Sequence, residues 1–325
     1  AQFLSRNKYN IILIDEQEER LNKIGQDYDL LTLQGKPTSI QILQEADVKH
    51  ADLFIAVDPK ETTNITACTM AHHLGAKKTV AKIDNPEYLE PKNQELFKQL
   101  GVDSLIYPEL LAAKDIINGL KMSWVRQRWD VRGGALVMLG IKLRDTCAIL
   151  DKPLREISGP NDPYHIVAIK RRNETIIPGG NETLQREDLA YFMTTKEYIP
   201  YVRKLTGKEH YVDVKNVMIM GGGRTAVRSV KIMPEYMDIK IIENSFDRCE
   251  YLNEIFDESV LVINGDGRDT DLLIEEGIRH TQAFVALTPN AETNILACMA
   301  AKNLGVRKTI AAVENFDYVD MAANL

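Results

Sequence analysis

Residues 217–226 read Val-Met-Ile-Met-Gly-Gly-Gly-Arg-Thr-Ala, a short apolar run that leads directly into three glycines. The run is typical of a buried strand, and the residues after it are typical of the start of a helix. Gly221, Gly223 and Ala226 match the spacing G-x-G-x-x-G/A. We therefore predict a tight turn at Gly221, close approach of a pyrophosphate at Gly223 and close packing of the helix on the strand at Ala226.

An acidic residue lies where a nucleotide-binding unit of this kind requires one. Glu243 follows Gly223 by 20 residues and ends the next predicted strand, Ile239–Glu243. At that position a carboxylate accepts hydrogen bonds from both hydroxyls of a ribose. Its charge also repels a 2′-phosphate, so we predict NAD(H) as the cofactor, with ATP or ADP as alternatives, and not NADP.

Two later strands of the same segment also end in candidate binding residues. The run Gly265-Asp266-Gly267 follows the predicted strand Val260–Ile263, and Thr288 follows Ala283–Leu287. Ligands bind at the carboxyl edge of such a sheet. Asp266 can reach an adenine there and Thr288 a ribose or phosphate, but capping of the following helix explains each residue equally well.

The unit that contains these residues occurs twice in the chain. Shifting the sequence by 230 positions aligns 35–89 with 265–319 without a gap, and 20 of the 55 positions are identical. In both copies short apolar runs alternate with helical stretches. Examples are Asn10–Asp15 and Thr79–Ile83 in the first copy and Val260–Ile263 in the second. This pattern predicts an α/β protein with two Rossmann-type domains, each a doubly wound parallel sheet.

In the first copy, the equivalent of Glu243 is Asp15, at a shift of 228 residues. The glycine turn would then precede residue 1, so we expect a fragment whose first copy lacks its first strand and phosphate loop. The same symmetry predicts that the second copy lacks its C-terminal part. The first site retains Asp15, Asp58 and Lys82 as candidates, while Lys36 and Pro37 replace the Asp-Gly pair.

The segment between the copies has a different pattern. The runs Ala135–Leu143, Ile166–Lys170 and Leu189–Thr194 are predicted strands, and Tyr198–Leu205 is a predicted short helix. We predict a small α+β domain at 124–212, between Rossmann-type domains at 1–123 and 213–325. The amphipathic stretch Pro108–Leu120 is predicted to be a helix that packs in the core or against another copy of the domain.

Composition excludes several classes of function. A net charge of −7 and a pI near 5.5 provide no basic surface for nucleic acid. No apolar run approaches the roughly 20 residues that span a bilayer, so we expect no direct membrane insertion. The four cysteines lie far apart without a C-x-x-C pair, which argues against a metal site and for a reducing, cytoplasmic location.

Several motifs together resemble the RCK, or KTN, family of regulators of potassium conductance. They are Thr-Pro-Asn-Ala-Glu-Thr-Asn-Ile at 288–295, Lys-Pro-Leu at 152–154, Ile-Pro-Gly at 177–179, and the acid after the second strand of each copy. The doubled arrangement resembles TrkA-type regulatory subunits of Trk potassium uptake systems, and the similarity covers nearly the whole chain.

The resemblance implies a function and a set of site residues. It implies a homo-oligomeric, cytoplasmic subunit on the inner face of the membrane that binds NAD(H), ATP or ADP and gates a Trk-type potassium-translocating subunit. The residues that match the family's phosphate loop are Gly221, Gly223, Arg224, Thr225 and Ala226. Its ribose acid corresponds to Glu243 and Asp15.

Two other classes of protein remain open at this point. An NAD-dependent oxidoreductase would share the fold, but the sequence offers no helix-borne histidine pair, no nucleophile with a base and no paired acids. We therefore predict a protein that is not an enzyme. RCK domains of a potassium efflux antiporter or channel are the second alternative, in which the same units would be fused to membrane helices.

Overall fold

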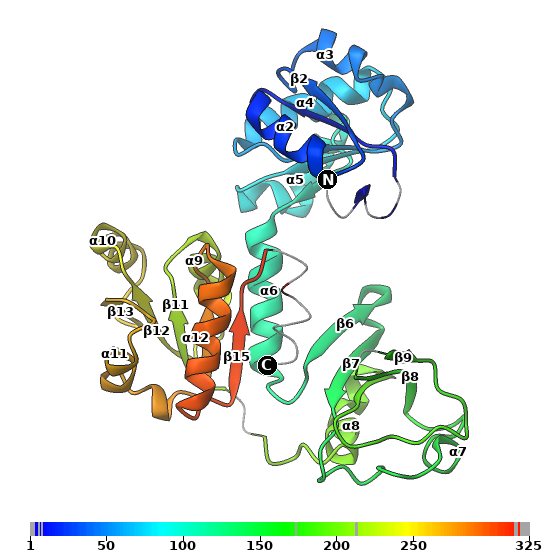
Figure 1. The fold of residues 1–325 in the computed structure, drawn as a ribbon, viewed down its shortest axis with the longest axis vertical. Coiled ribbons are helices and arrows are strands. Elements are labelled where there is room, and N and C mark those ends of the chain that lie inside the picture. Colours follow the sequence, from blue (N-terminus) through cyan, green and yellow to red (C-terminus); the bar gives the residue numbers. More distant parts are fainter. Residues whose placement is uncertain are drawn as a thin grey trace. The chain divides into compact units, whose positions relative to one another are not determined.

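The computed structural model describes residues 4–5, 7, 9–172, 174–211, 214–314 and 318. The chain forms two compact units, Ala1–Leu111 and Ala112–Leu325. The first unit holds the first repeat copy (Figure 1). The second unit holds the small middle domain and the second repeat copy.

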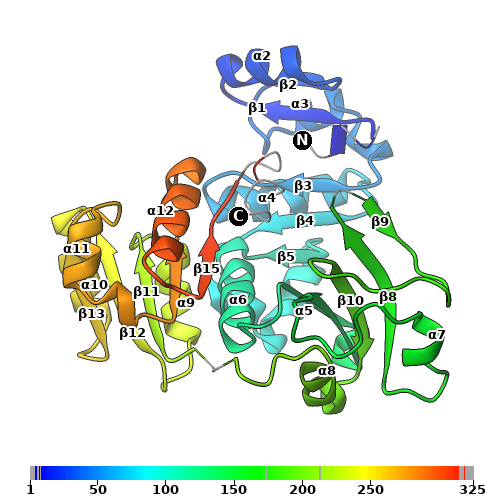
Figure 2. The same cartoon turned by 60° about the horizontal axis from the view of Figure 1, so that its bottom comes forward.

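The second copy forms one parallel five-stranded sheet in the order β13-β12-β11-β14-β15 (Figures 1 and 2). Its strands are β11 (Asn216–Met220), β12 (Asp238–Glu243), β13 (Val260–Asn264), β14 (Ala283–Ala286) and β15 (Lys308–Ala311). The order reverses at β11, because β12 lies on one side of it and β14 on the other. This arrangement is the Rossmann topology that the sequence predicts.

Helices pack on both faces of this sheet and bury two separate apolar clusters. The helices are α9 (Arg224–Ile232), α10 (Phe246–Ile255), α11 (Thr270–Glu275), α12 (Ala291–Asn303) and the 3-10 helix η5 (Ile278–His280). Helices α9 and α10 share one cluster with the sheet, and α11 and α12 share the other. The prediction of a doubly wound sheet is confirmed in this copy.

Helix α6 (Pro108–Lys121) adds a third element to the α9 face of the second sheet. Its side chains Ile116, Ile117 and Leu120 belong to the same apolar cluster as α9 and β11. A Cβ atom on Gly119 would lie 3.2 Å from the Ile310 Cδ1 atom, which shows how closely the helix approaches β15. The amphipathic helix that follows the first copy in the chain therefore packs, through these residues, on the second copy.

The first copy contains the same elements with one difference in its sheet. Its elements are β1 (Ile12–Asp15), α2 (Glu18–Asp27), β2 (Leu31–Gln34), α3 (Ile40–Glu45), η1 (Val48–His50), β3 (Phe54–Ala56), α4 (Glu61–His73), β4 (Thr79–Lys82), η2 (Pro86–Leu89), α5 (Pro91–Gln99) and β5 (Ser104–Ile106). The strands form two parallel sheets, β1-β2 and β3-β4-β5. Among the described residues, no strand pairs with both β1 and β3, the position that β11 occupies in the second copy.

The middle domain is an antiparallel five-stranded sheet in the order β6-β7-β10-β8-β9. Its elements are β6 (Gln127–Val131), η3 (Arg132–Gly134), β7 (Leu136–Lys142), α7 (Leu154–Ile157), β8 (Tyr164–Arg171), β9 (Glu174–Ile176), β10 (Leu189–Thr194), η4 (Lys196–Tyr198) and α8 (Ile199–Leu205). Phe192 and Leu139 are fully buried in its own apolar cluster. The predicted α+β domain therefore has an apolar core of its own.

All four cysteines are free and buried. Burial raises the pKa of Cys68 and Cys298 to about 12, so these thiols stay protonated and unreactive at neutral pH. None of the helices in the described ranges combines the length and the hydropathy that crossing a membrane requires. The same residues contain no cluster of three or more His, Cys, Asp or Glu side chains that could hold a metal ion.

A half-buried cation, Lys308, lies where β15 meets the start of the middle domain. The Lys308 ammonium donates a hydrogen bond to the Val125 carbonyl oxygen at 3.1 Å. Burial, together with the positive charges of Arg126 and Lys302, lowers the pKa of Lys308 to about 8. The charged form of Lys308 is therefore disfavoured in the folded chain.

Replacing Lys308 by methionine should stabilise the chain at pH 7. The Lys308 pKa is about 8 when folded and 10.5 in the reference state, so the folded state binds fewer protons between these values. Unfolding of the unaltered chain therefore becomes less favourable as pH rises across this window. At pH 7 the variant should be more stable by on the order of 2 kcal/mol, after subtracting the lost hydrogen bond.

Urea unfolding at pH 7 and near pH 10 checks this prediction. The advantage of Lys308→Met should shrink at the higher pH, because the unaltered side chain is then neutral in the folded state. Lys78 is the repeat equivalent of Lys308 and is exposed, so Lys78→Met is the matched control. An equal advantage of Lys308→Met at both pH values would contradict the prediction.

Candidate functional site

At the carboxyl end of β11, two of the three glycines of the turn lie where a side chain would collide with neighbouring atoms. Gly221 has a φ of +96°, and a Cβ there would lie 3.2 Å from the backbone N of Thr288. A Cβ on Gly222 would lie 2.4 Å from the Leu252 Cδ1 atom. These contacts bring the turn against the loop that follows β14 and against α10.

Gly223 differs from its neighbours because its Cβ position is open. It has an ordinary extended conformation, and no atom lies within 4 Å of a Cβ built there. Gly223 is the N-cap of α9, and no side chain accepts a hydrogen bond at this cap. The start of α9 therefore has no side-chain cap, and the positive end of its dipole faces the open position beside Gly223.

The first turn of α9 contains the other predicted phosphate-loop residues. Arg224 and Thr225 are the first two residues of the helix, and Ala226 is fully buried against the sheet. The Thr225 carbonyl oxygen accepts a hydrogen bond from the Ser229 hydroxyl at 2.8 Å. The small Ala226 side chain lets the helix lie close to the strand.

The Glu243 carboxylate lies directly beside the glycine turn. Its Oε2 atom accepts a hydrogen bond from the Gly222 backbone N–H at 2.7 Å, and Oε1 accepts one from Ser245 N–H at 2.9 Å. Each carboxylate oxygen has two lone pairs. Glu243 is thus fixed in position by the backbone and keeps the capacity to accept further hydrogen bonds from a ribose.

Thr288 lies on the opposite side of the glycine turn from Glu243, because β12 and β14 flank β11. The buried side chain of Asn294 holds it. The Asn294 Oδ1 atom accepts hydrogen bonds from the Thr288 backbone N–H at 3.0 Å and from its hydroxyl at 2.7 Å. Asn294 Nδ2 donates to the carbonyl oxygens of Thr288 at 2.8 Å and Ala312 at 2.9 Å.

The Asp-Gly pair after β13 borders the same edge of the sheet. A Cβ on Gly267 would lie 2.3 Å from the Met220 Cγ atom, so only glycine fits beside the last residue of β11. The Asp266 carboxylate pairs with the Arg268 guanidinium at 2.7 Å, and this partner lowers the Asp266 pKa. Both side chains are exposed, and the reach of Asp266 to an adenine stays a prediction.

Sequence reasoning missed two residues of this site. One is Asn294. The other is Arg248, whose Nε donates to the Gly222 carbonyl oxygen at 2.8 Å and whose guanidinium lies 4.4 Å from the centre of the Tyr251 ring. The repeat contained a signal for both, because Asn64 and Arg20 are their equivalents in the first copy.

The first copy brings together two of its three candidates. The Asn64 amide accepts a hydrogen bond from Asp58 N–H and donates to the carbonyl oxygens of Asp58 and Lys82, as Asn294 does in the second copy. Asp15 ends β1 on the other sheet, where its carboxylate accepts a hydrogen bond from Gln17 N–H. Lys36 follows β2, at the position of Asp266.

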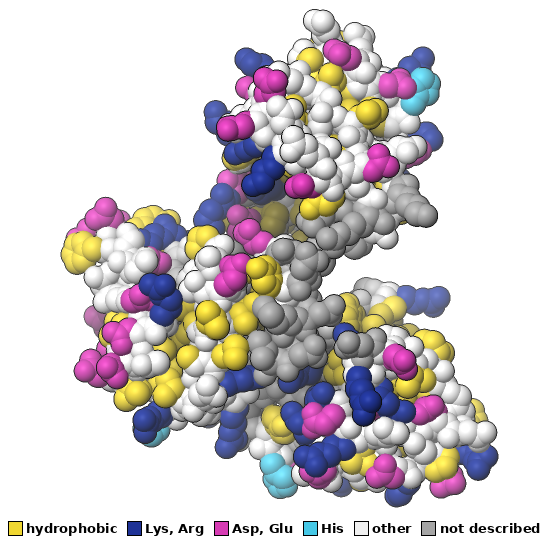
Figure 3. All heavy atoms as spheres, viewed as in Figure 1, with side chains coloured by type: hydrophobic (Ala, Val, Ile, Leu, Met, Phe, Trp, Pro, Cys, Tyr) yellow, Lys and Arg dark blue, Asp and Glu magenta, His cyan; other side chains and the backbone are white. Residues whose placement is uncertain are grey.

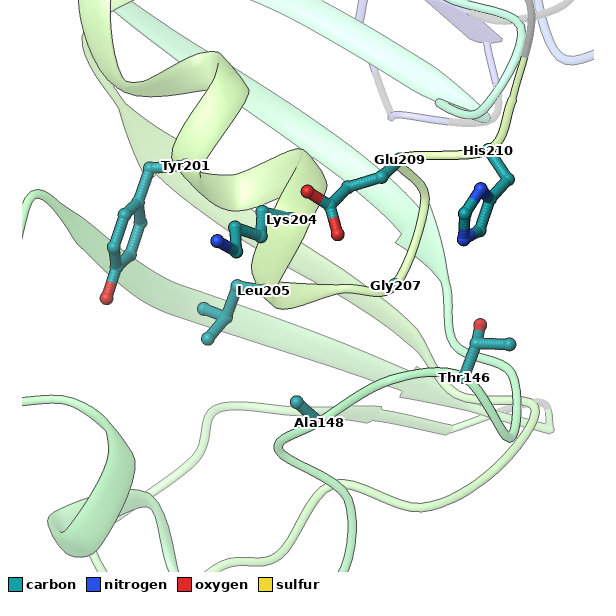
Figure 4. A pocket seen from close by; sticks show the side chains of 8 residues that line it. All are labelled: Thr146, Ala148, Tyr201, Lys204, Leu205, Gly207, Glu209 and His210. Atoms are coloured by element: carbon teal, nitrogen blue, oxygen red, sulfur yellow. The ribbon is translucent and has the colours of Figure 1, made fainter.

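A cavity of about 510 Å³ lies in the middle domain (Figure 4). Lys204 and Leu205 reach it from α8, Glu209 and His210 from the segment after α8, and Thr146 from the loop after β7. The cavity combines opposite charges with apolar side chains. It contains none of the predicted nucleotide-binding residues.

The repeat and the middle domain match two known family models. The TrkA-N domain model matches residues 1–108 and again 217–325, and the TrkA-C domain model matches 138–207. The two TrkA-N matches together cover more than half of the chain. The chain belongs to the TrkA-N domain family. The predicted resemblance and the order of the three domains are confirmed.

Curated relatives align with nearly the whole chain. "Trk system potassium uptake protein TrkA" of Halomonas elongata is 29% identical over 99% of the chain and 70% of its own length. The protein of that name from Vibrio alginolyticus has the same values. A TrkA homolog of Archaeoglobus fulgidus is 28% identical over 96% of the chain and 70% of its own length.

Solved structures share the fold of these TrkA-N copies at low sequence identity. The structure named "GsuK Channel" has a TM-score of 0.67 at 14% identity, covering 99% of the chain and 59% of its own. The "GsuK channel bound to NAD" has a TM-score of 0.65 at 15% identity, with the same coverage. The chain thus spans less than two thirds of these channels, and the likeness establishes the fold alone.

Proposed function

We propose that the chain is a nucleotide-binding regulatory subunit of a potassium uptake system. The observation that supports this most is the pairing of an uncapped helix start at Gly223 with a carboxylate at Glu243, held 2.7 Å from the turn by Gly222. The helix start favours phosphate, and the carboxylate favours ribose hydroxyls. Relatives named as TrkA potassium uptake proteins supply the physiological context.

NAD(H) is the ligand that we propose first, with ATP and ADP as alternatives. One structural neighbour is described as bound to NAD and another as bound to ADP. The proposed contacts in the second copy are Gly221, Gly223, Arg224, Thr225 and Ala226 for the phosphates, Glu243 for the ribose, and Asp266, Gly267 and Thr288 around them. In the first copy they are Asp15, Asp58 and Lys82.

The two sites differ chemically. The second copy has an Asp-Gly pair after β13, whereas the first has Lys36 and Pro37, and Thr288 is replaced by Asp58. A carboxylate at 58 and a cation at 36 change the charge at the phosphate edge. We therefore propose that the sites bind nucleotides with unequal affinity.

Nucleotide binding would act on a membrane partner through a shift between two arrangements of the domains. A ligand moves such an equilibrium only by its difference in affinity for the two states. The partner that we propose is a Trk-type potassium-translocating subunit on the cytoplasmic side of the membrane. No turnover of the nucleotide is needed for this role, so the chain is proposed to be a regulator and not an enzyme.

We propose that several copies of the chain assemble through the outer face of α12. Hydrophobic side chains gather over this part of the surface (Figure 3), and α12 contributes Leu296 and Met299, which are 64% and 37% exposed. At the equivalent positions of α4 the first copy has Thr66 and Thr69. An apolar outer face on one copy alone favours a homo-oligomer in which α12 is covered.

Calorimetry of the intact chain with NADH, NAD⁺, ATP and ADP tests the binding function, and potassium uptake by cells that carry the gene tests the regulatory one. We expect saturable binding of at least one of these nucleotides, and uptake that requires an intact glycine turn. Steady NADH oxidation in the presence of a small substrate would instead favour the oxidoreductase. Absence of binding by all four nucleotides would refute the proposal.

A further inference from the structure

Asn294 uses the whole hydrogen-bonding capacity of its amide on two loops. Its Oδ1 accepts two hydrogen bonds from Thr288, and its Nδ2 donates two, to Thr288 O and Ala312 O, at distances of 2.7 to 3.0 Å. The side chain is fully buried. Only a carboxamide offers two acceptor sites and two donors in this shape, so the loops after β14 and β15 are held together by one group.

The first copy has the same arrangement. Its occurrence in both copies indicates that the hydrogen-bonding pattern is a feature of the fold and not of one local sequence. Asn64 makes three equivalent hydrogen bonds to Asp58 and Lys82, at 2.7 to 2.9 Å, and is also buried. The residue held after β3 differs, because Asp58 stands where Thr288 stands. The asparagine and its hydrogen-bonding geometry are thus retained although the residue that it positions has changed.

Asn294 lies at one side of the candidate nucleotide site and not at its centre. The Thr288 backbone nitrogen lies 3.2 Å from the Cβ position of Gly221, so the loop that Asn294 holds forms one wall of the glycine turn. Glu243 forms the opposite wall, beyond β11. In the proposed placement, with the ribose at Glu243 and the first phosphate at α9, the groups beyond that phosphate extend toward Thr288.

We infer that Asn294 is a positioning residue for the second half of a dinucleotide. It holds Thr288 against the glycine turn and ties it to the end of β15, and it does not touch the adenosine half. This inference rests on the proposed nucleotide site in the second copy. It distinguishes two ligands: AMP, which ends at the first phosphate, and NADH, which continues across the turn.

The experiment measures AMP and NADH binding by calorimetry on the full chain and on Asn294→Asp. The substitution keeps the shape but removes both donors, which leaves the carbonyl oxygens of Thr288 and Ala312 facing a carboxylate. NADH affinity should fall about 10-fold to 30-fold and AMP affinity by less than about 2-fold, since only one wall moves. Asn303→Asp, the same change at the exposed end of α12, should alter neither.

A second pair of variants covers the case in which Asn294→Asp does not fold. Thr288→Val removes the hydroxyl that donates a hydrogen bond to Asn294 Oδ1 at 2.7 Å, and Thr288→Ser keeps it. NADH affinity should fall about 5-fold to 10-fold in the valine variant and recover in the serine variant, with AMP unchanged in both.

The outcomes separate this inference from the proposed function. Failure of the unaltered chain to bind either ligand would overturn the nucleotide site and the inference together. Normal binding by the unaltered chain, with equal losses for AMP and NADH in the variants, would overturn the inference alone, because a general loss of structure weakens both ligands. Unchanged NADH binding in folded variants would overturn it as well.

Discussion

Gly223→Asp should abolish nucleotide binding while the fold becomes slightly more stable. The new side chain meets no atom of the chain within 4 Å of its Cβ, and aspartate is a preferred N-cap residue. The same carboxylate occupies the space at the start of α9 and repels a phosphate. We expect NADH affinity to fall more than about 100-fold and stability to rise by about 0.5–1 kcal/mol.

Calorimetry and thermal unfolding of the same preparations test this pair of opposite effects. Gly179→Asp is the control, because Gly179 also has open space at its Cβ and lies in the middle domain. It should leave NADH binding unchanged. Adenosine, which carries no phosphate, should lose far less affinity for Gly223→Asp than NADH does. If NADH bound the variant normally, the phosphate position assigned to α9 would be wrong.

Glu243→Gln should weaken NADH binding and reduce the discrimination against NADPH. The amide keeps the size of the side chain but removes the negative charge, which strengthens the hydrogen bonds accepted from the ribose hydroxyls and repels a 2′-phosphate. We expect NADH affinity to fall about 10-fold to 30-fold. NADPH affinity should rise relative to that of NADH, because the repulsion is gone.

The ratio of the two affinities is the decisive measurement for Glu243. Gly222 and Ser245 donate backbone hydrogen bonds to this carboxylate, so part of any loss arises from the turn itself. That part affects both ligands equally and cancels in the ratio. Glu250→Gln removes the same charge from the exposed side of α10 and should change neither affinity. A constant ratio would mean that Glu243 does not face the 2′ position.

The sequence predicts the second copy well because its signals are local. The strands around Gly221 are continuous apolar runs that end at a glycine motif, and the acid at Glu243 follows at a fixed distance. By contrast, β6 (Gln127–Val131) is an edge strand with polar and charged side chains. It forms because β7 pairs with it, and that cause is not visible in its own sequence.

The parts of the site that sequence reasoning missed depend on contacts between distant residues. Arg248 acts on the carbonyl oxygen of Gly222, which lies 26 residues earlier and on a different element. The motif specifies glycines and an acid but no partner for that oxygen. Asn294 falls in a matched stretch of the repeat, and only its burial and its four hydrogen bonds distinguish it from a surface helix residue.

Helix α6 makes the two copies of the repeat structurally unequal. It follows β5 of the first copy, yet Ile116, Ile117 and Leu120 complete the core of the second. The core of the second copy thus depends on side chains that precede the middle domain in the chain. Separating the copies at the start of the middle domain would remove these three side chains from the core of the second sheet.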